Sequence, residues 1–320
     1  MGKVKKKLVL YMLSIILIII VAVPSFSKNV YAKTMDEKIV DKQIAELKKK
    51  KISGYKFHEA YAVKFTGKNV EEIVVSSYGF EKGTNYIDKS LLQVYQYNAS
   101  QKKWKILKEF VSKNDVFTYS PLSFITKGKL VNSKKEALVV GHRWGNDYTL
   151  SPMVLGSVDG KTVKMLISPK NKSFTDGTAI IKGRQLYFIN FLSTVSERYA
   201  YKNGKLVKYK GTGSDDRKVA GGAKHLLLLE KKYGKFSLTG NKNIRMKVGE
   251  SFSIIRKNKS DRTNYIYRFL INLNDKGPLK NNGGSLKAVK PGKIDFTVIL
   301  DDQSINQSFN AEDIEITVTK

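Results

Sequence analysis

The chain begins with a charged and then strongly apolar segment. Lysines dominate residues 3–7, and residues 8–23 form an apolar run broken only by Ser14. A positive start, an apolar core and the small residues of Val30-Tyr31-Ala32 are typical of a secretory signal peptide. We therefore expect residues 1–32 to be a signal peptide that is removed after Ala32.

Two alternatives remain open for this segment. Ser25-Phe26-Ser27 offers a second cleavage site. An uncleaved segment would act as a membrane anchor, although its 16-residue apolar run falls short of the about 20 residues that span a bilayer.

The next segment has the pattern of one amphipathic helix. Apolar residues recur at helical spacing, at Ile39, Val40, Ile44 and Leu47. Thr34 and Glu37 have the spacing of a capping box. The helix would end in a lysine run, where the helix dipole favours positive charge, formed by Lys48, Lys49, Lys50 and Lys51. We expect a helix and a linker over residues 33–54, with the lysine run either a solvated helix end or an anion-binding patch.

From Tyr61 onward the pattern changes to short strands rich in β-branched and aromatic residues, separated by polar turns. Residues 65–75 and 130–140 resemble each other at a period of 65, each with a polar turn before an apolar strand. Two hairpins and a partial third copy are expected at residues 92–107, 153–166 and 185–209. Repeated units of this kind predict propeller-like blades.

These units resemble the FG-GAP or VCBS-type, integrin-α-like repeats of secreted bacterial proteins. Their loop, D-x-x-G-D-G-x-x-E, corresponds in position to Thr66–Glu72 and Val131–Glu136. The resemblance implies a propeller-like β-repeat domain over residues 55–210. Three units are too few for a closed ring, so either a degenerate blade is hidden or the array is open.

Calcium binding does not carry over from this resemblance. The aspartates that bind calcium in the family are replaced here by Lys, Asn, Val and Ser. Calcium needs several hard oxygen ligands gathered in one loop. We therefore expect no metal and no cofactor.

The last part of the chain has a second β pattern. Glycine-rich residues 211–234 predict a linker with a short helix, and alternating strands follow. The order V-G-E-S-F, then L-K-A-V-K-P-G-K with F-T-V, then a final strand at residues 314–319 resembles bacterial Ig-like domains of the group 2 type. The resemblance implies a β-sandwich over residues 235–320, used in that family as a spacer or adhesive module. The expected fold class is thus all-β.

Charge narrows the choice of partner. The formal charge is +30, and setting aside the five lysines of residues 1–32 leaves +25. Residues 33–234 hold +19 of it, with 38 basic against 19 acidic side chains. An exported polycation meets anionic wall polymers, anionic lipids and nucleic acid. Cysteine is absent, which excludes disulfides, thiolate metal sites and a lipid-modified cysteine.

Few residues have the spacing of a catalytic site. His58, His142 and His225 lie far apart in the sequence, so we expect no histidine-based triad or metal centre. Residues 156–162 resemble a P-loop but are one residue too short, and an Asp-Gly turn is expected there. Asp215-Asp216 and Asp301-Asp302 would point to opposite faces of a strand or be solvated in a loop. We expect no catalytic residues.

These features predict a non-enzymatic secreted or cell-surface bacterial protein. Its expected partner is an anionic cell-wall polymer or a surface protein, with nucleic acid bound only non-specifically and a membrane only if residues 1–32 stay attached. The alternatives are a secreted effector or ligand-binding module acting after release, and an enzyme with an unrecognised site.

Overall fold

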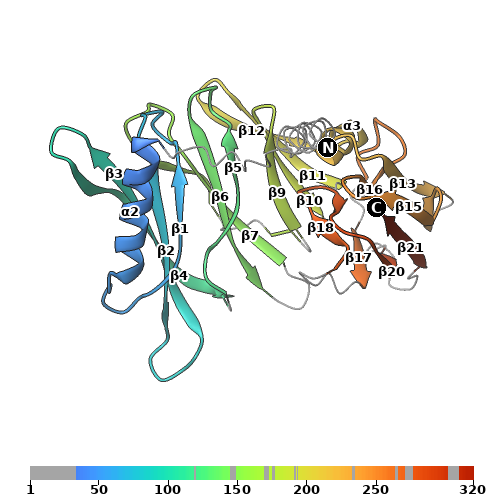
Figure 1. The fold of residues 1–320 in the computed structure, drawn as a ribbon, viewed down its shortest axis with the longest axis horizontal. Helices are drawn as coiled ribbons and strands as arrows, with labels where there is room; N and C mark the ends of the chain where they lie inside the picture. The colour runs from blue at the N-terminus through green and yellow to red at the C-terminus, as the bar shows by residue number, and fades with distance from the viewer. Residues whose placement is uncertain are drawn as a thin grey trace, which may run out of the picture. The chain divides into compact units, whose positions relative to one another are not determined.

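The computed structural model describes residues 34–118, 120–144, 149–168, 173–174, 177–190, 192, 194–232, 235–263, 266–270, 277–301 and 310–320. The expected signal peptide therefore lies outside the described residues. Across the described ranges the chain is mostly β, with several antiparallel sheets, none of them closed (Figure 1). The all-β prediction is confirmed. Within the same ranges, no helix has the length and apolar character needed to cross a membrane.

The predicted first helix is α2, Met35–Lys49. Its capping box forms as expected: the Thr34 N–H donates to Glu37 Oε2 at 2.8 Å, and the Glu37 N–H donates to Thr34 Oγ1 at 3.2 Å. Val40 and Leu47 on its apolar face are buried. The lysine run follows at the C-terminal end of the helix.

Three four-stranded antiparallel sheets follow one another in the described sequence. The first contains β1 (Lys56–Val63), β2 (Glu72–Phe80), β3 (Ile87–Asn98) and β4 (Lys103–Thr118). The second contains β5 (Ser123–Lys129), β6 (Glu136–Trp144), β7 (Thr149–Gly156) and β8 (Lys164–Ile167). The third contains β9 (Gly177–Lys182), β10 (Gln185–Asn190), β11 (Thr194–Lys202) and β12 (Lys205–Lys210). The predicted hairpins are the pairs β3–β4 and β7–β8, and the partial third copy is β10–β12.

The central strands are buried on both faces, which explains their uninterrupted apolar sequences. In β2, Val74 packs in one cluster with Leu138 of β6. Its neighbours Ile73 and Val75 pack in another cluster with Leu47 of α2. Successive side chains of a strand point to opposite faces, so β2 contacts the second sheet on one side and α2 on the other.

The same alternation continues along the array. In β10, Leu186 and Phe188 share a core with residues of the second sheet. Tyr187 and Ile189, on the other face, pack with Val219 of helix α3 (Gly213–Ala220). The outer faces of the first and third sheets are therefore each covered by a helix, as the terminal repeats of stacked β structures require.

Two further sheets form the C-terminal part of the described chain. One has the order β14-β13-β16-β19-β18 and the other β15-β21-β20-β17. The first comprises β13 (His225–Lys232), β14 (Lys235–Thr239), β16 (Ser251–Arg256), β18 (Leu279–Asn281) and β19 (Leu286–Ala288). The second comprises β15 (Asn243–Lys247), β17 (Ile266–Leu270), β20 (Gly292–Asp301) and β21 (Asn310–Thr319). Both sheets contribute to one core, which includes Leu227, Phe252 and Ile316.

Residues 211–234 contain a short helix, α3, and the strand β13. β13 belongs to the five-stranded sheet and runs parallel to β16. Leu227 and Leu229 face the core, while Leu228 packs against a cluster that includes Ile255. Because apolar side chains of β13 pack on both of its faces, its sequence shows no alternation.

Asp215 and Asp216 lie neither in a strand nor in a solvated loop, so both alternatives expected for this pair are wrong. Both lie in α3 and are buried, with 1% and 0% of their surface exposed. Asp215 completes a capping box with Thr212, and Asp216 is ion-paired with Arg256. Asp302 lies outside the described residues, so the second acidic pair remains a prediction.

Candidate functional site

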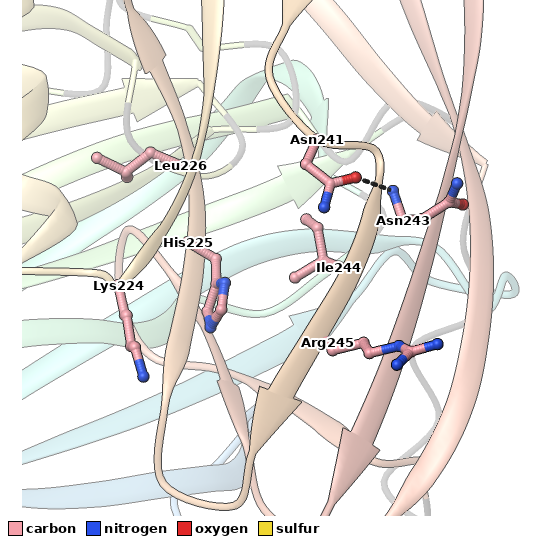
Figure 2. Close-up of a pocket in the computed structure, with 7 residues that line it drawn as sticks. All are labelled: Lys224, His225, Leu226, Asn241, Asn243, Ile244 and Arg245. Carbon is pink, nitrogen blue, oxygen red and sulfur yellow. Dashed lines mark hydrogen bonds between the residues drawn. The ribbon is translucent and has the colours of Figure 1, made fainter.

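A pocket of about 550 Å³ opens where β13 and β15 face each other across the two C-terminal sheets. It is lined by Lys224, His225, Leu226, Asn241, Asn243, Ile244 and Arg245 (Figure 2). In Figure 2, His225 and Ile244 lie between Lys224 on one side and Arg245 on the other. A lysine, a histidine, an arginine and two asparagine side chains thus border one opening.

Strand alternation places these side chains. Ile244 is buried and forms part of the common core, so its neighbours Asn243 and Arg245 point to the outer face of β15. On β13, Leu227 enters the core, so His225, two residues earlier, lies on the same face at the open end of the strand. The pocket therefore has an apolar floor and a polar rim.

Glu250 fixes the Lys224 side of the pocket. Its Oε1 accepts a hydrogen bond from Lys224 Nζ at 2.5 Å, and its Oε2 accepts one from the Lys247 N–H at 3.0 Å. The same Oε2 lies 2.9 Å from His225 Nε2. The bonds from Lys224, His225 and Lys247 lower the pKa of Glu250 to about 2. This carboxylate is therefore ionised at neutral pH and holds Lys224 and His225 in place.

Arg245 has no acidic partner among the described residues. The nearest strand neighbour, β21, brings Glu315 opposite Asn243, but Glu315 is ion-paired with Lys293 at 2.7 Å. Arg245 itself is exposed. Its guanidinium is thus a positive group open to solvent beside the pocket.

Asn241 is oriented by its own turn. Its Oδ1 accepts a hydrogen bond from the Asn243 N–H at 3.0 Å. The amide nitrogen then lies beside Ile244 in Figure 2. The pocket can therefore offer an amide donor in addition to its cations.

The predicted anion-binding lysines lie elsewhere. Lys48, Lys49, Lys50 and Lys51 are all exposed at the end of α2. Lys50 Nζ lies 5.7 Å from the centre of the Tyr95 ring, within the range of a cation–π contact. Exposure agrees both with a solvated helix end and with an anion-binding patch, so the patch remains a prediction.

A serine, a histidine and a glutamate meet at the boundary of the first two sheets. His58 Nε2 lies 3.0 Å from Ser123 Oγ and 2.7 Å from Glu59 Oε1. A catalytic triad needs the carboxylate on the ring nitrogen opposite the nucleophile. Here both groups share one nitrogen, so the geometry of a triad is not formed.

The contact between His58 and Ser123 was not predicted from the sequence. His58 and Ser123 are 65 residues apart, which equals the period expected from the sequence. They lie on β1 and β5, the first strands of consecutive sheets. The period was therefore the signal that could have paired them.

His142 is a core residue. Its side chain is buried, and Nδ1 lies 2.8 Å from the Ser120 carbonyl oxygen. Nε2 is buried without a hydrogen-bond partner in the described residues. Burial lowers the pKa of His142, so the ring is neutral at physiological pH.

The P-loop-like residues form a turn, as expected. Asp159 accepts hydrogen bonds from the Lys161 and Thr162 N–H groups, both at 2.8 Å. A phosphate-binding loop needs such N–H groups for its ligand. In this turn the Asp159 carboxylate already occupies them.

The described residues contain no cluster of three or more histidine, cysteine or acidic side chains arranged to hold a metal. Lys224 and Arg245, which line the pocket, and Glu250, which pairs with Lys224, were not predicted to form a site. They come from separate segments of the sequence. No protein-family model matches the chain, and no curated protein sequence matches it.

Proposed function

We propose that this protein is a non-enzymatic component of a bacterial cell envelope that is exported and binds an anionic polymer. The observation that carries the proposal is the charge: +25 outside residues 1–32, of which residues 33–234 hold +19. A surface with this excess attracts polyanions over several ångströms.

The edge strands support the proposal. β4 and β12 are each the edge strand on one side of their sheet. Their exposed lysines are Lys103, Lys105 and Lys108 on β4 and Lys205, Lys208 and Lys210 on β12. Lysines also protect sheet edges from aggregation, and the same rows of charge provide repeated contacts for a linear polyanion.

We further infer that the three stacked sheets are propeller-like units in an open array and that the C-terminal sheets are an Ig-like sandwich. Support comes from the 65-residue period, the four-stranded meanders and the two-sheet core. We infer that the β sheets act as a scaffold for the positively charged surface. The shared nitrogen at His58 and the occupied turn at Asp159 favour binding over catalysis.

The experiment is a binding assay on isolated bacterial cell walls. Intact walls should retain the protein, whereas walls from which the anionic polymers have been extracted should not. Detergent should leave retention unchanged, because the proposed contacts are between charged groups. Equal retention on extracted walls would contradict the proposal and indicate recognition of the uncharged wall or of a surface protein.

A further inference from the structure

We propose that one end of the two C-terminal sheets docks on an anionic lipid surface and inserts the tips of two turns into it. The proposed function supplies only the exported location, which gives the protein access to the outer face of a membrane. The site differs in place and in chemistry from the distributed charge of residues 33–234 that would hold the wall polymer.

Two turns lie side by side at this end. Residues 248–250 connect β15 to β16, and residues 289–291 connect β19 to β20. The Gly249 N–H donates to the Ala288 carbonyl oxygen at 2.8 Å, and the Ala288 N–H donates to the Glu250 carbonyl oxygen at 2.9 Å. These bonds join the two turns where the strands of both sheets end.

Each turn carries an exposed valine. Val248 is 44% exposed and Val289 is 37% exposed, while their backbone N–H groups donate to the carbonyl oxygens of Thr319 and Pro278. Among the described residues of these two sheets, the remaining exposed large apolar side chain is Leu226, near the start of β13 at the same end. The apolar tips are therefore presented on turns whose backbone is already fixed.

Unpaired lysines flank the tips on both sides. Lys247 is exposed on the outer face of β15 and Lys287 on that of β19, because in each strand the preceding residue is buried in the core. Lys290 is exposed in the second turn. None of these three lysines is ion-paired with a described residue. The acidic side chain described at the turns, Glu250, is already bonded to Lys224.

Charge and apolar exposure together select the occupant. A second copy of this chain would bring like charges together, and a soluble polyanion would leave the valines in water. An anionic membrane satisfies both features. Its headgroups attract the lysines, burial of apolar surface favours insertion of the valines, and the long lysine side chains can still reach the headgroups.

The test uses vesicles of phosphatidylglycerol and phosphatidylcholine with residues 33–320, the expected secreted form, which contains every described residue. Because the chain has no cysteine, Val248→Cys provides a unique position for a dye whose emission shifts to the blue in an apolar environment. We expect a blue shift when vesicles are added, and quenching by a quencher attached to the acyl chains. Vesicles of phosphatidylcholine alone should produce neither effect.

Lys259→Cys is the matched control. Lys259 is exposed just beyond the C-terminal end of β16, whereas Val248 lies just before its start. The 6 residues of β16 separate these positions by about 20 Å, more than the about 8 Å over which charges interact at physiological salt. A dye at position 259 should therefore stay in water.

Three outcomes would overturn the inference. The first is that the protein does not bind the anionic vesicles. The second is that it binds while the dye at position 248 stays in water or shifts no more than the dye at position 259. The third is a blue shift at position 248 caused by a soluble anionic polymer without lipid, which would assign the tips to a polymer.

Charge variants test the contribution of the lysines. With the dye at position 248 as the readout, Lys290→Gln should weaken vesicle binding about fivefold, the usual contribution of one basic residue near an anionic surface. Lys259→Gln removes the same charge at the opposite end and should leave the affinity unchanged. An equal loss in both variants would reduce the binding to general attraction and contradict the defined site.

The membrane site and the wall proposal fail separately. Retention on walls without insertion of the tips into vesicles removes only the membrane site. Insertion into vesicles without retention on walls removes only the polymer. Thermal unfolding checks that each labelled protein is folded. If Val248→Cys does not fold, Val289→Cys places the dye on the second turn and gives the same test.

Discussion

At the residue scale, Arg256 and Asp216 form a fully buried ion pair that joins α3, β11 and β16. Arg256 Nη2 donates to Asp216 Oδ1 at 2.6 Å, and Nε donates to Oδ2 at 2.7 Å. The other guanidinium bonds reach the carbonyl oxygens of Gly211, Val195 and Thr263. All groups around the charge are thus occupied, which is the condition for a buried pair to be tolerated.

Removing one partner should be costly. Asp216→Asn leaves the buried guanidinium without its counter-charge, so we expect the free energy of unfolding to fall by about 3–5 kcal/mol, measured by urea denaturation. Lys257→Gln, which breaks the exposed pair with Glu230, should cost less than about 1 kcal/mol. Similar losses in the two variants would show that the buried pair is not the main support of this junction.

The neutral ring of His142 gives the stability a defined pH dependence. Burial lowers its pKa in the folded state, so the unfolded chain takes up the proton first as the pH falls. The stability that the neutral His142 ring contributes is fully present above the ordinary histidine pKa, near 6.5. It is lost as the pH falls from there through the folded-state pKa.

We expect His142→Asn to reduce the slope of the free energy of unfolding against pH. The amide N–H can replace the Nδ1 donor to the Ser120 carbonyl oxygen and does not titrate. The measurement is the free energy of unfolding of both proteins between about pH 7 and 5. Identical slopes for the variant and the wild type would place the pH dependence in other groups.

At the element scale, α2 is the cover of the first sheet. Leu47 is 5% exposed and shares a core with Ile73, Val75 and Tyr95. Without the helix, one face of an apolar strand would meet water. The helix should therefore contribute to the stability of the stack rather than act as a tether.

Leu47→Ala should lower the free energy of unfolding by about 2–5 kcal/mol, the usual range for a buried leucine. Glu46→Ala, exposed on the same helix, should change it by less than about 0.5 kcal/mol. Thermal or urea unfolding measures both. A small effect of Leu47→Ala would mean that the first sheet is stable without its cover.

Local patterns predicted the elements that depend on neighbours in sequence. The capping box at Thr34, the hairpins and the Asp159 turn depend on residues a few positions apart, and each is present. β13 was missed because apolar side chains pack on both of its faces, Leu227 and Leu229 on one and Leu228 on the other, and because its partner β16 is parallel and distant in sequence. The pocket was missed for the same reason, since its two sides meet only after the sheets pack.

Arg256 shows a further limit of sequence patterns. Arginine is among the residues that are almost never fully buried unless paired, and the pair with Asp216 spans 40 residues. The alternation around Arg256 in β16 indicates a strand, but nothing local identifies its partner.

At the scale of the whole molecule, apolar side chains stabilise the fold and exposed lysines provide the positive surface charge. The stacked sheets and the C-terminal sheets bury apolar side chains between layers, while most of the described lysines are exposed. A polymer bound by such a surface makes many weak contacts. Each of them depends on the ionic strength, because screening acts over about 8 Å at physiological salt and about 3 Å at 1 M.

The most direct test of this account is the fraction of protein retained on isolated cell walls as sodium chloride rises from low concentration to 1 M at constant pH. Distributed electrostatic binding predicts strong retention at low salt and almost complete release at 1 M. Retention that persists in 1 M sodium chloride would contradict the account and indicate either a covalent link or a binding site that does not depend on charge.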